Sequence, residues 1–445
     1  MKTVSNRPAW MFALLVLTAA FLPFALEAEQ WGSWRGPNDD GMAATDAPTK
    51  WSDTENVKWK TAIPGKGHSS PVVWGDRIFL TTAIPVGTPP PPPAEPEGGR
   101  RGPGGGAGPL IEHHFDVLSI DKNSGKVLWQ KTANVATPHE GYHRQYGSFA
   151  SNSPVTDGTH VFAFFGSRGV YAYDFDGNLQ WKKDFNVKME MHLAFGEGIA
   201  PVLEGNTLLL TYDHKGGSFL VALDKTSGEE RWRAERDEIS NWAPPLVAEH
   251  EGRKQVVVAA TQKVRSYDFE TGKLIWEAAG LGMNTIPTPV QQGDLVLVMS
   301  GYRDPNLMAI RLGRTGDLTG TDAIVWSETR GTSYTPSPVL YDGKLYMLTD
   351  RGMLSCLNAE TGEPYYHQVR LPETHSFKAS PVGAAGKLYL ASEEGDVIIV
   401  KMGPEFEVIA TNTLKDQIFI ASPAIVGGEI FLRGQSTLFA ISEKR

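Results

Sequence analysis

A Ser-Pro-Val-like phrase recurs eight times along this chain of 445 residues, at nearly equal intervals. Its prolines are Pro71, Pro154, Pro201, Pro245, Pro289, Pro338, Pro381 and Pro423. Apart from a first interval of 83 residues, they follow one another every 42 to 49 residues. This period is typical of a four-stranded propeller blade and differs from the periods of helical solenoids and leucine-rich repeats. The sequence therefore predicts an all-β fold, an eight-bladed β-propeller of four-stranded antiparallel blades.

A second phrase, Gly-x-x-x-aromatic, follows an Asp or Asn turn in five of the units. It pairs Gly125 with Trp129, Gly177 with Trp181, Gly228 with Trp232, Gly272 with Trp276 and Gly362 with Tyr366. Glycine adopts positive φ in a tight turn, and Asp or Asn side chains hydrogen-bond the turn backbone. The aromatic side chains then share one position on the outer strand, where we expect them to brace neighbouring blades. Trp326 is predicted to take this position in a less regular unit.

The two ends of the chain indicate how the ring closes. Only 22 residues follow Pro423, which is enough for three strands. Segment 56–62 carries an aromatic residue, Trp59, and lies before the first repeat. We expect this N-terminal strand to complete the last blade, because such closure removes exposed sheet edges.

The predicted boundaries are a signal peptide over 1–28, an N-terminal extension over 29–50 and the propeller over 51–445. The first segment has basic residues, then an apolar stretch over 11–26, then Ala28 at a cleavage position. This stretch is short for a membrane span of roughly 20 residues. We therefore expect export rather than integration into a membrane, with an uncleaved anchor as the alternative.

Segment 84–110 holds nine prolines and eight glycines and is predicted to be a disordered insertion in the first blade. The net charge of −9 favours solubility and argues against nucleic acid as a partner. The single cysteine, Cys356, excludes an intramolecular disulfide and is expected to be buried in a strand. Since no cysteine lies near residue 28, we expect that the protein is not a lipoprotein. We further expect a monomer of the periplasm or outer-membrane periphery.

Strand direction alternates within a blade, so two kinds of loop share one face of the ring. The loops between blades and the loops between second and third strands define what we call the site face, and the opposite face is the turn face. Eight of the eleven histidines fall in site-face loops, together with several Lys and Arg residues. Ligands of ring-shaped folds usually enter at such a mouth. The candidate ligand-binding residues are His68, His143, Arg144, Arg168, His192, Glu197, His214, Trp242 and Arg303.

An alternative interpretation is that these loop residues are solvated or paired with nearby carboxylates. If the histidines bind a ligand, affinity should depend on pH between about 5.5 and 7.5, where unperturbed imidazoles titrate. His139-Glu140-Gly141-Tyr142-His143 also matches a zinc-protease pattern, which requires both histidines on one helical face. Because the match contains Gly141 and follows Thr137-Pro138, we expect a loop there and no metal site.

The alternation of Ser-Pro-Val with Asp-x-x-Thr-Gly-x-x-x-Trp resembles the PQQ-binding-like, or quinoprotein-like, β-propeller repeat family. Its members include quinoprotein alcohol dehydrogenases and the outer-membrane assembly factor BamB. The resemblance runs from about residue 51 to the C-terminus. Segments 31–38 and 195–198, Trp-Gly-Ser-Trp-Arg-Gly-Pro-Asn and Phe-Gly-Glu-Gly, are similar to a BamB-like subset of secreted bacterial proteins.

The resemblance implies two hypotheses. The first is an exported binding or scaffold protein of the cell envelope, without a catalytic residue, that binds an envelope protein or outer-membrane component through its site face. The alternative is a PQQ-dependent dehydrogenase or other enzyme that uses the central funnel, with PQQ, Ca2+ and Glu197 as the base. A chain with one cysteine cannot form the disulfide between adjacent cysteines or the Cys-x-x-Cys-His haem-binding segment of quinoprotein dehydrogenases. It also lacks the lipidated cysteine that tethers BamB to the membrane.

Overall fold

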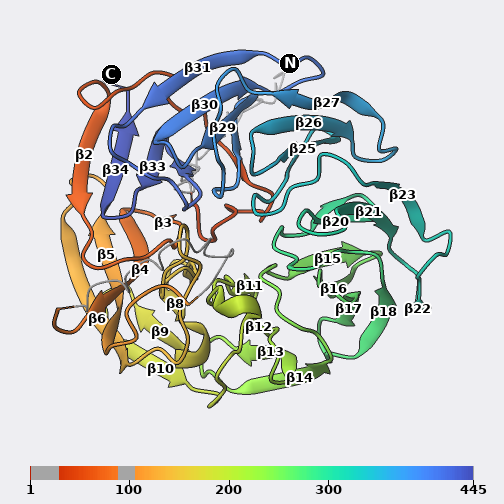
Figure 1. The fold of residues 1–445 in the computed structure, drawn as a ribbon, viewed down its shortest axis with the longest axis horizontal. Helices are drawn as coiled ribbons and strands as arrows, with labels where there is room; N and C mark the ends of the chain where they lie inside the picture. The colour runs from red at the N-terminus through yellow and green to blue at the C-terminus, as the bar shows by residue number, and fades with distance from the viewer. Residues whose placement is uncertain (2–29, 89–105, 444–445) are drawn as a thin grey trace, which may run out of the picture.

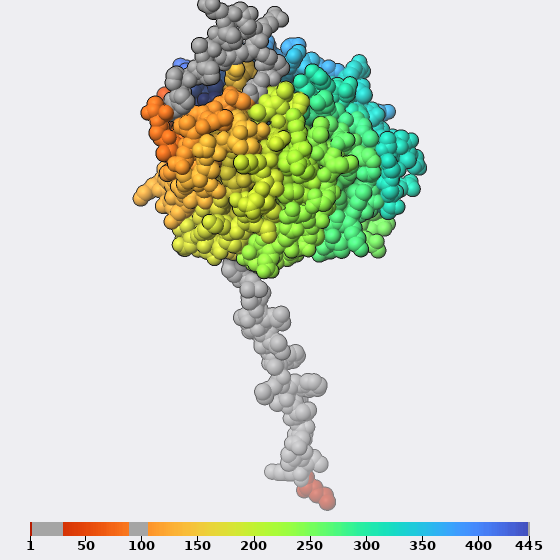
Figure 2. Space-filling view, turned by 60° about the horizontal axis from the view of Figure 1, so that its bottom comes forward, coloured from red at the N-terminus to blue at the C-terminus, as the bar shows by residue number. Residues whose placement is uncertain are grey.

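The computed structural model describes residue 1, residues 30–88 and residues 106–443. The predicted signal segment thus lies outside the described residues, apart from Met1, and so does the middle of the 84–110 insertion. Eight blades follow one another in sequence order around a common axis (Figure 1), and we call the region along this axis the central channel. Figure 2 shows successive blades side by side around the outside of the ring. The predicted all-β eight-bladed propeller is confirmed.

Each blade contains four antiparallel strands. The inner strands are β3 (Val72–Trp74), β7 (Val155–Thr156), β11 (Val202–Glu204), β15 (Leu246–His250), β19 (Val290–Gln292), β24 (Val339–Tyr341), β28 (Val382–Ala384) and β32 (Ala424–Val426). The second strands are β4 (Arg77–Pro85), β8 (His160–Phe164), β12 (Thr207–Tyr212), β16 (Arg253–Val258), β20 (Leu295–Ser300), β25 (Lys344–Leu348), β29 (Lys387–Ala391) and β33 (Glu429–Arg433).

The third strands are β5 (His113–Asp121), β9 (Val170–Asp174), β13 (Ser218–Asp224), β17 (Val264–Asp268), β21 (Asn306–Arg311), β26 (Met353–Asn358), β30 (Asp396–Lys401) and β34 (Thr437–Ser442). The outer strands are β6 (Val127–Ala136), β10 (Leu179–Lys183), β14 (Glu230–Arg236), β18 (Leu274–Ala278), β23 (Ile324–Glu328), β27 (Pro364–Arg370), β31 (Val408–Thr413) and β2 (Val57–Ala62). Four short elements are added to them: β1 (Met42–Ala43), β22 (Gly316–Asp317), η1 (Gly166–Arg168) and η2 (His192–Ala194).

The N-terminal strand closes the ring, as predicted. β2 pairs antiparallel with β34 and forms the outer edge of the blade that contains β32 and β33 (Figure 1). Trp59 of β2 then joins this last blade to the first one, because its Nε1 donates to the carbonyl of Lys122 at 2.9 Å. Arg433 spans the same interface and donates to the carbonyl oxygens of Ser69 and Thr81 at 2.8 and 2.9 Å. The chain ends therefore meet within one sheet.

At five places in the described ring, an outer-strand tryptophan contacts the turn glycine of the next blade, whereas Trp276 Nε1 donates to Gln255 Oε1 of its own blade at 3.0 Å. Trp232 Nε1 donates to the carbonyl of Phe269 in the following blade at 2.9 Å. Its indole ring also covers Gly272, where an added Cβ would lie 2.5 Å from the ring. The same arrangement places Trp59 on Gly125, Trp129 on Gly177, Trp181 on Gly228 and Trp326 on Gly362. The glycine therefore serves both the positive φ of its own turn and the ring of the preceding blade.

The serine of the Ser-Pro-Val phrase links the inner ends of the blades. In five places a backbone N–H donates to the hydroxyl of the next blade: Thr288 to Ser337, Ser337 to Ser380, Ser380 to Ser422, Ser422 to Ser70, and Ser70 to Ser153, all at 2.8 or 2.9 Å. We call this series the serine ring. It is interrupted where Ala200 and Pro244 replace the hydroxyl residue. Pro244 also lacks the N–H that would continue the series.

The N-terminal extension lies inside the channel and is part of the propeller rather than a separate appendage. Trp31 exchanges two backbone hydrogen bonds of 2.8 Å with Val73 of β3, and β1 pairs in parallel with β28. Arg35 is buried between these contacts and donates to the carbonyl oxygens of Pro338 and Pro381, the latter at 2.9 Å. The extension thus ties inner strands from opposite parts of the ring.

The two ends of the 84–110 segment are structured. Ile84 and Pro85 are the last two residues of β4, and Ala107 forms an antiparallel bridge with Tyr142. Cys356 is fully buried in β26, as expected. Within the described ranges, no helix has the length and apolar character needed to cross a bilayer.

We predict that Trp232→Ala lowers the free energy of unfolding by about 3 to 5 kcal/mol, the usual cost of truncating a buried large aromatic. The change removes the ring that covers Gly272 and leaves the Phe269 carbonyl without its donor. Urea denaturation measures the loss, with Tyr365→Ala as the control because Tyr365 is 43% exposed. A loss below about 1 kcal/mol would contradict the bracing role.

Candidate functional site

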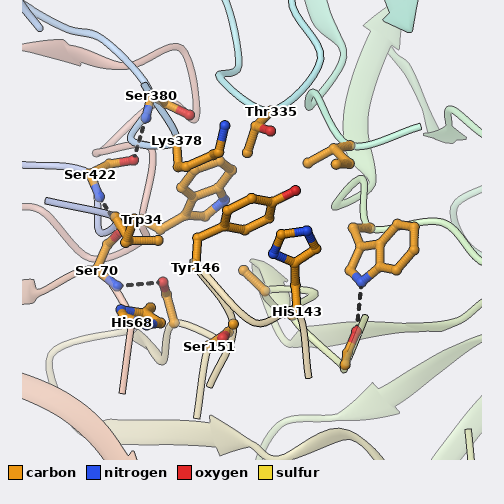
Figure 3. A pocket seen from close by; sticks show the side chains of 18 of the residues that line it. Trp34, His68, Ser70, His143, Tyr146, Ser151, Thr335, Lys378, Ser380 and Ser422 are labelled. Atoms are coloured by element: carbon orange, nitrogen blue, oxygen red, sulfur yellow. Dashed lines mark hydrogen bonds between the residues drawn. The ribbon is translucent and has the colours of Figure 1, made fainter. Parts of the chain in front are cut away.

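A pocket of ≈ 180 Å³ opens on the site face, at the mouth of the central channel (Figure 3). Its walls come from most of the blades and from the N-terminal extension. The lining residues are Trp34, His68, Ser70, His143, Tyr146, Gly147, Ser151, Ser153, Phe195, Gly196, Glu197, Gly198, Ala200, Trp242, Pro244, Ile286, Tyr334, Thr335, Lys378, Ser380, Ile420 and Ser422.

Aromatic rings form much of this lining. Trp34 reaches the pocket from the channel, and Figure 3 shows it together with Tyr146 and His143 at the centre of the view. The rings of Tyr146 and His143 are stacked, with centroids 3.6 Å apart and planes 16° from parallel. Trp242 is fixed in place because its Nε1 donates to the Gly196 carbonyl at 2.8 Å. The flat indole faces of Trp34 and Trp242 therefore form apolar parts of the pocket wall.

Four hydroxyl groups of the serine ring lie in the same pocket, those of Ser70, Ser153, Ser380 and Ser422. Each oxygen accepts one backbone N–H, which fixes its position. In the described part of the chain, none of these hydroxyls has an acceptor for its own hydrogen. A serine hydroxyl both donates and accepts, so each retains a donor for a ligand.

The two pocket histidines are neutral at physiological pH. Burial lowers the pKa of His68 to about 3, and the nearby Lys66 and Arg433 charges act in the same direction. Burial, with Lys378 and Arg144 nearby, lowers the pKa of His143 to about 4. His68 Nε2 and His143 Nδ1 lack hydrogen-bond partners among the described residues. The expected titration between pH 5.5 and 7.5 therefore does not apply to these two imidazoles, because burial disfavours their charged form.

The charged groups of the lining are neutralised locally. Glu197 accepts from Arg168 Nη1 at 2.9 Å and from the Ser167 backbone N–H and hydroxyl at 2.6 and 2.7 Å. Lys378 Nζ lies 2.7 Å from Asp350 Oδ2 and 3.5 Å from Glu393 Oε1. Among the described lining residues these are the carboxylate and the ammonium group, so the pocket is polar but nearly uncharged.

The structure gathers four of the sequence-predicted site residues in the pocket: His68, His143, Glu197 and Trp242. Arg168 lies behind Glu197, and buried His214 accepts from the Gly216 backbone N–H. The pKa of His214 is lowered by burial, and so is that of His192, which lies near Lys215 and Arg303. Arg144 and Arg303 are exposed.

Sequence reasoning missed Trp34, Tyr146 and Tyr334, as well as the serines that it treated as repeat punctuation. The serines could have been found, because a hydroxyl residue directly precedes six of the eight repeated prolines and this position repeats at the same place in each blade. Trp34 carried no such signal, since it precedes the repeats.

Four exposed cations lie in site-face loops. We call them the cationic rim: Arg144, Lys215, Arg303 and Arg351. No carboxylate of the described residues forms a salt bridge with any of them. Two of these cations lie near His192, because the charges of Lys215 and Arg303 act with burial to lower its pKa. Unpaired cations of an acidic chain thus lie in the loops of one face, where exposed Glu190, Asp304 and Glu373 also lie.

Metal binding finds little support in this geometry. Segment 139–143 is not helical, and His139 Nε2 lies 2.9 Å from the Met189 carbonyl. The carboxylate of Glu140 accepts from the Met191 backbone N–H. Glu373, His375 and Asp396 could approach a cation together, but His375 Nε2 already contacts Asp396 Oδ2 at 2.9 Å, away from the pocket lining.

We predict that acid destabilises the protein through His68. Its pKa is about 3 when folded, against the ordinary 6.5, so between these values only the unfolded chain binds the proton and stability falls as pH decreases. Between pH 7.5 and pH 5 the wild-type chain should lose about 2 kcal/mol more than His68→Gln, at about 1.4 kcal/mol per pH unit below the ordinary pKa. Urea midpoints measured at both pH values check this, and parallel losses in the two proteins would contradict it.

Comparison with known proteins places these features in a family. The sequence pattern of the family described as outer membrane protein assembly factor BamB matches residues 113–192 and 168–402. The outer membrane protein assembly factor BamB of Yersinia pestis is 21% identical over 339 residues, which cover 73% of this chain and 79% of that protein.

Solved structures share the fold. BamB from Moraxella catarrhalis superposes with a TM-score of 0.54 at 12% identity, over 87% of this chain and 98% of that chain. A europium-containing methanol dehydrogenase gives a TM-score of 0.63 at 10% identity, over 93% and 98%. The quinohemoprotein alcohol dehydrogenase of Comamonas testosteroni gives 0.59 at 9% identity, over 95% and 82%. Because the matched family pattern spans more than half of the chain, this protein belongs to the PQQ-like β-propeller family of the outer membrane protein assembly factor BamB.

Proposed function

We propose that this protein is an exported binding or scaffold protein of the bacterial cell envelope that docks an acidic surface of a partner protein on its cationic rim. The observation that carries the proposal is the rim itself: four exposed cations without salt-bridge partners in the described residues, gathered on one face of an acidic protein. Surface cations of one sign steer an oppositely charged partner and set its orientation. Membership of the BamB family supports an envelope partner.

A quinoprotein dehydrogenase is the second candidate, and the pocket residues do not fit its cofactor. Pyrroloquinoline quinone carries three carboxylates, which require cationic partners when they leave water. The pocket offers Lys378, whose ammonium group is already held by Asp350 and Glu393. Glu197, the base proposed for that chemistry, accepts three hydrogen bonds from Arg168 and Ser167. Both of its oxygens are therefore already engaged by donors of the protein.

The rim predicts a charge-dependent complex. We expect Arg144→Glu, Arg303→Glu and Arg351→Glu together to reduce recovery of an envelope partner at least tenfold, and recovery by the wild-type chain to fall between 50 and 300 mM salt, since exposed charges are screened over about 8 Å at physiological ionic strength. Crosslinking in envelope extract, followed by mass spectrometry of the bound protein, measures recovery and identifies the partner.

The matched control reverses three exposed cations of the turn face, Lys126→Glu, Arg253→Glu and Lys273→Glu. Lys126 and Lys273 lie in the turns between β5 and β6 and between β17 and β18, and Arg253 begins β16. Both triple variants change the net charge by the same amount, so a general charge effect would weaken both. Equal recovery by the two variants would contradict docking on the rim.

A further inference from the structure

The pocket on the site face holds polar groups whose hydrogen-bonding capacity the protein does not use. His68 is 7% exposed and His143 is 9% exposed, yet each has a ring nitrogen without a partner in the described chain. Buried polar atoms are nearly always paired, so an unpaired one in a pocket wall calls for a ligand or solvent atom. Since both imidazoles are uncharged, each supplies one acceptor and one donor in total.

Hydroxyl groups of the serine ring add directed donors at the base of the same pocket. Ser70, Ser153, Ser380 and Ser422 are held by backbone N–H groups and keep their own hydrogens available. These serines come from four consecutive blades and lie with His68 along one side of the pocket (Figure 3), whereas Ala200, Pro244 and Ile286 line other parts of it. A ligand that satisfies them must carry several oxygens along one edge.

Aromatic faces and low charge narrow the ligand class further. Trp34 and Trp242 offer apolar surface for a ring with C–H groups on its faces, whereas the ring of Tyr146 is already stacked on His143 and approached by Lys378 Nζ at 4.7 Å. Glu197 and Lys378 are compensated by Arg168 and Asp350, so neither an anion nor a cation gains a free counter-charge. The cavity of ≈ 180 Å³ has room for one small ring and its substituents.

We propose that this pocket binds a neutral sugar ring, either a free aldose or the terminal unit of an envelope glycan. The ring faces lie against the aromatic walls, and the hydroxyl groups bond to the two imidazoles and the serine ring. An apolar side chain of a bound peptide would fit the walls but would bury the imidazole nitrogens and serine hydroxyls unpaired, which is unfavourable. This binding goes beyond the partner docking proposed for the rim and does not depend on it.

Saturation-transfer NMR on the mature chain tests the proposal. The probes are glucose, galactose, mannose and N-acetylglucosamine, each as the free sugar and as the methyl glycoside. We expect at least one to bind with a Kd of about 1 mM, the range for a small ligand with modest interaction energy per atom. Binding of the methyl glycoside indicates the terminal unit of a glycan, because its anomeric position is blocked, whereas binding of the free sugar alone indicates an aldose.

Two variants separate sugar recognition from simple hydrophobic filling. Trp242→Ala removes a wall and should weaken sugar binding about tenfold. His143→Phe keeps a ring stacked on Tyr146 but removes both nitrogens, so it should also weaken sugar binding about tenfold while binding of N-acetylphenylalanine amide is retained or strengthened. Tyr341→Ala, on the turn face, is the control and should leave the Kd unchanged. Melting temperatures confirm that each variant is folded.

Failure of every sugar to show transfer while N-acetylphenylalanine amide binds would overturn the proposal and identify an apolar side-chain pocket. An unchanged sugar Kd in folded His143→Phe would overturn it as well, since the site would then lie elsewhere. Neither result would affect docking on the rim, because the rim test measures a partner protein and uses different residues.

Discussion

Pairing between β2 and β34 is the interaction on which the rest of this structure depends. A propeller blade without its outer strand exposes a row of backbone donors and acceptors, and the ring then has a free edge. Here the first strand of the chain supplies that row to the last blade. Trp59 then repeats between the last and first blades the contact that Trp129, Trp181 and Trp232 make around the ring.

The same closure explains the site. Once the blades form a ring, the residues before each repeated proline meet at one mouth, where the serine hydroxyls link blade to blade. The series is interrupted at Ala200 and Pro244, both in the pocket wall, and there Trp242 and Glu197 provide the lining instead. The repeated serines thus form a polar pocket, because the hydrogen bonds between blades use the serine oxygens as acceptors and leave the hydroxyl hydrogens available. Arg35 and Trp34 of the N-terminal extension fill the channel beneath this pocket.

Much of the fold could be predicted from the sequence because blades are local. The repeat period, the turn glycines and the aromatic residue Trp59 all reflect contacts within a blade or between neighbouring blades. The position of the extension could not be predicted, since Arg35 contacts Pro338 and Pro381, which are 303 and 346 residues away, and no repeat marks that pairing. The loops predicted to carry histidines place His68 and His143 in the pocket lining, but their lowered pKa values could not be predicted, because burial depends on the packed loops around them.

The most direct test of ring closure compares the chain that begins at residue 30 with one that begins at residue 64, by thermal unfolding followed with circular dichroism. The shorter chain lacks β2 and the channel segment, so several hydrogen bonds worth roughly 1 kcal/mol each are lost. We predict that it melts at least about 5 °C lower or shows no cooperative transition, since each kcal/mol corresponds to about 1 °C in a protein of this size. Melting of both chains within about 2 °C would contradict the account.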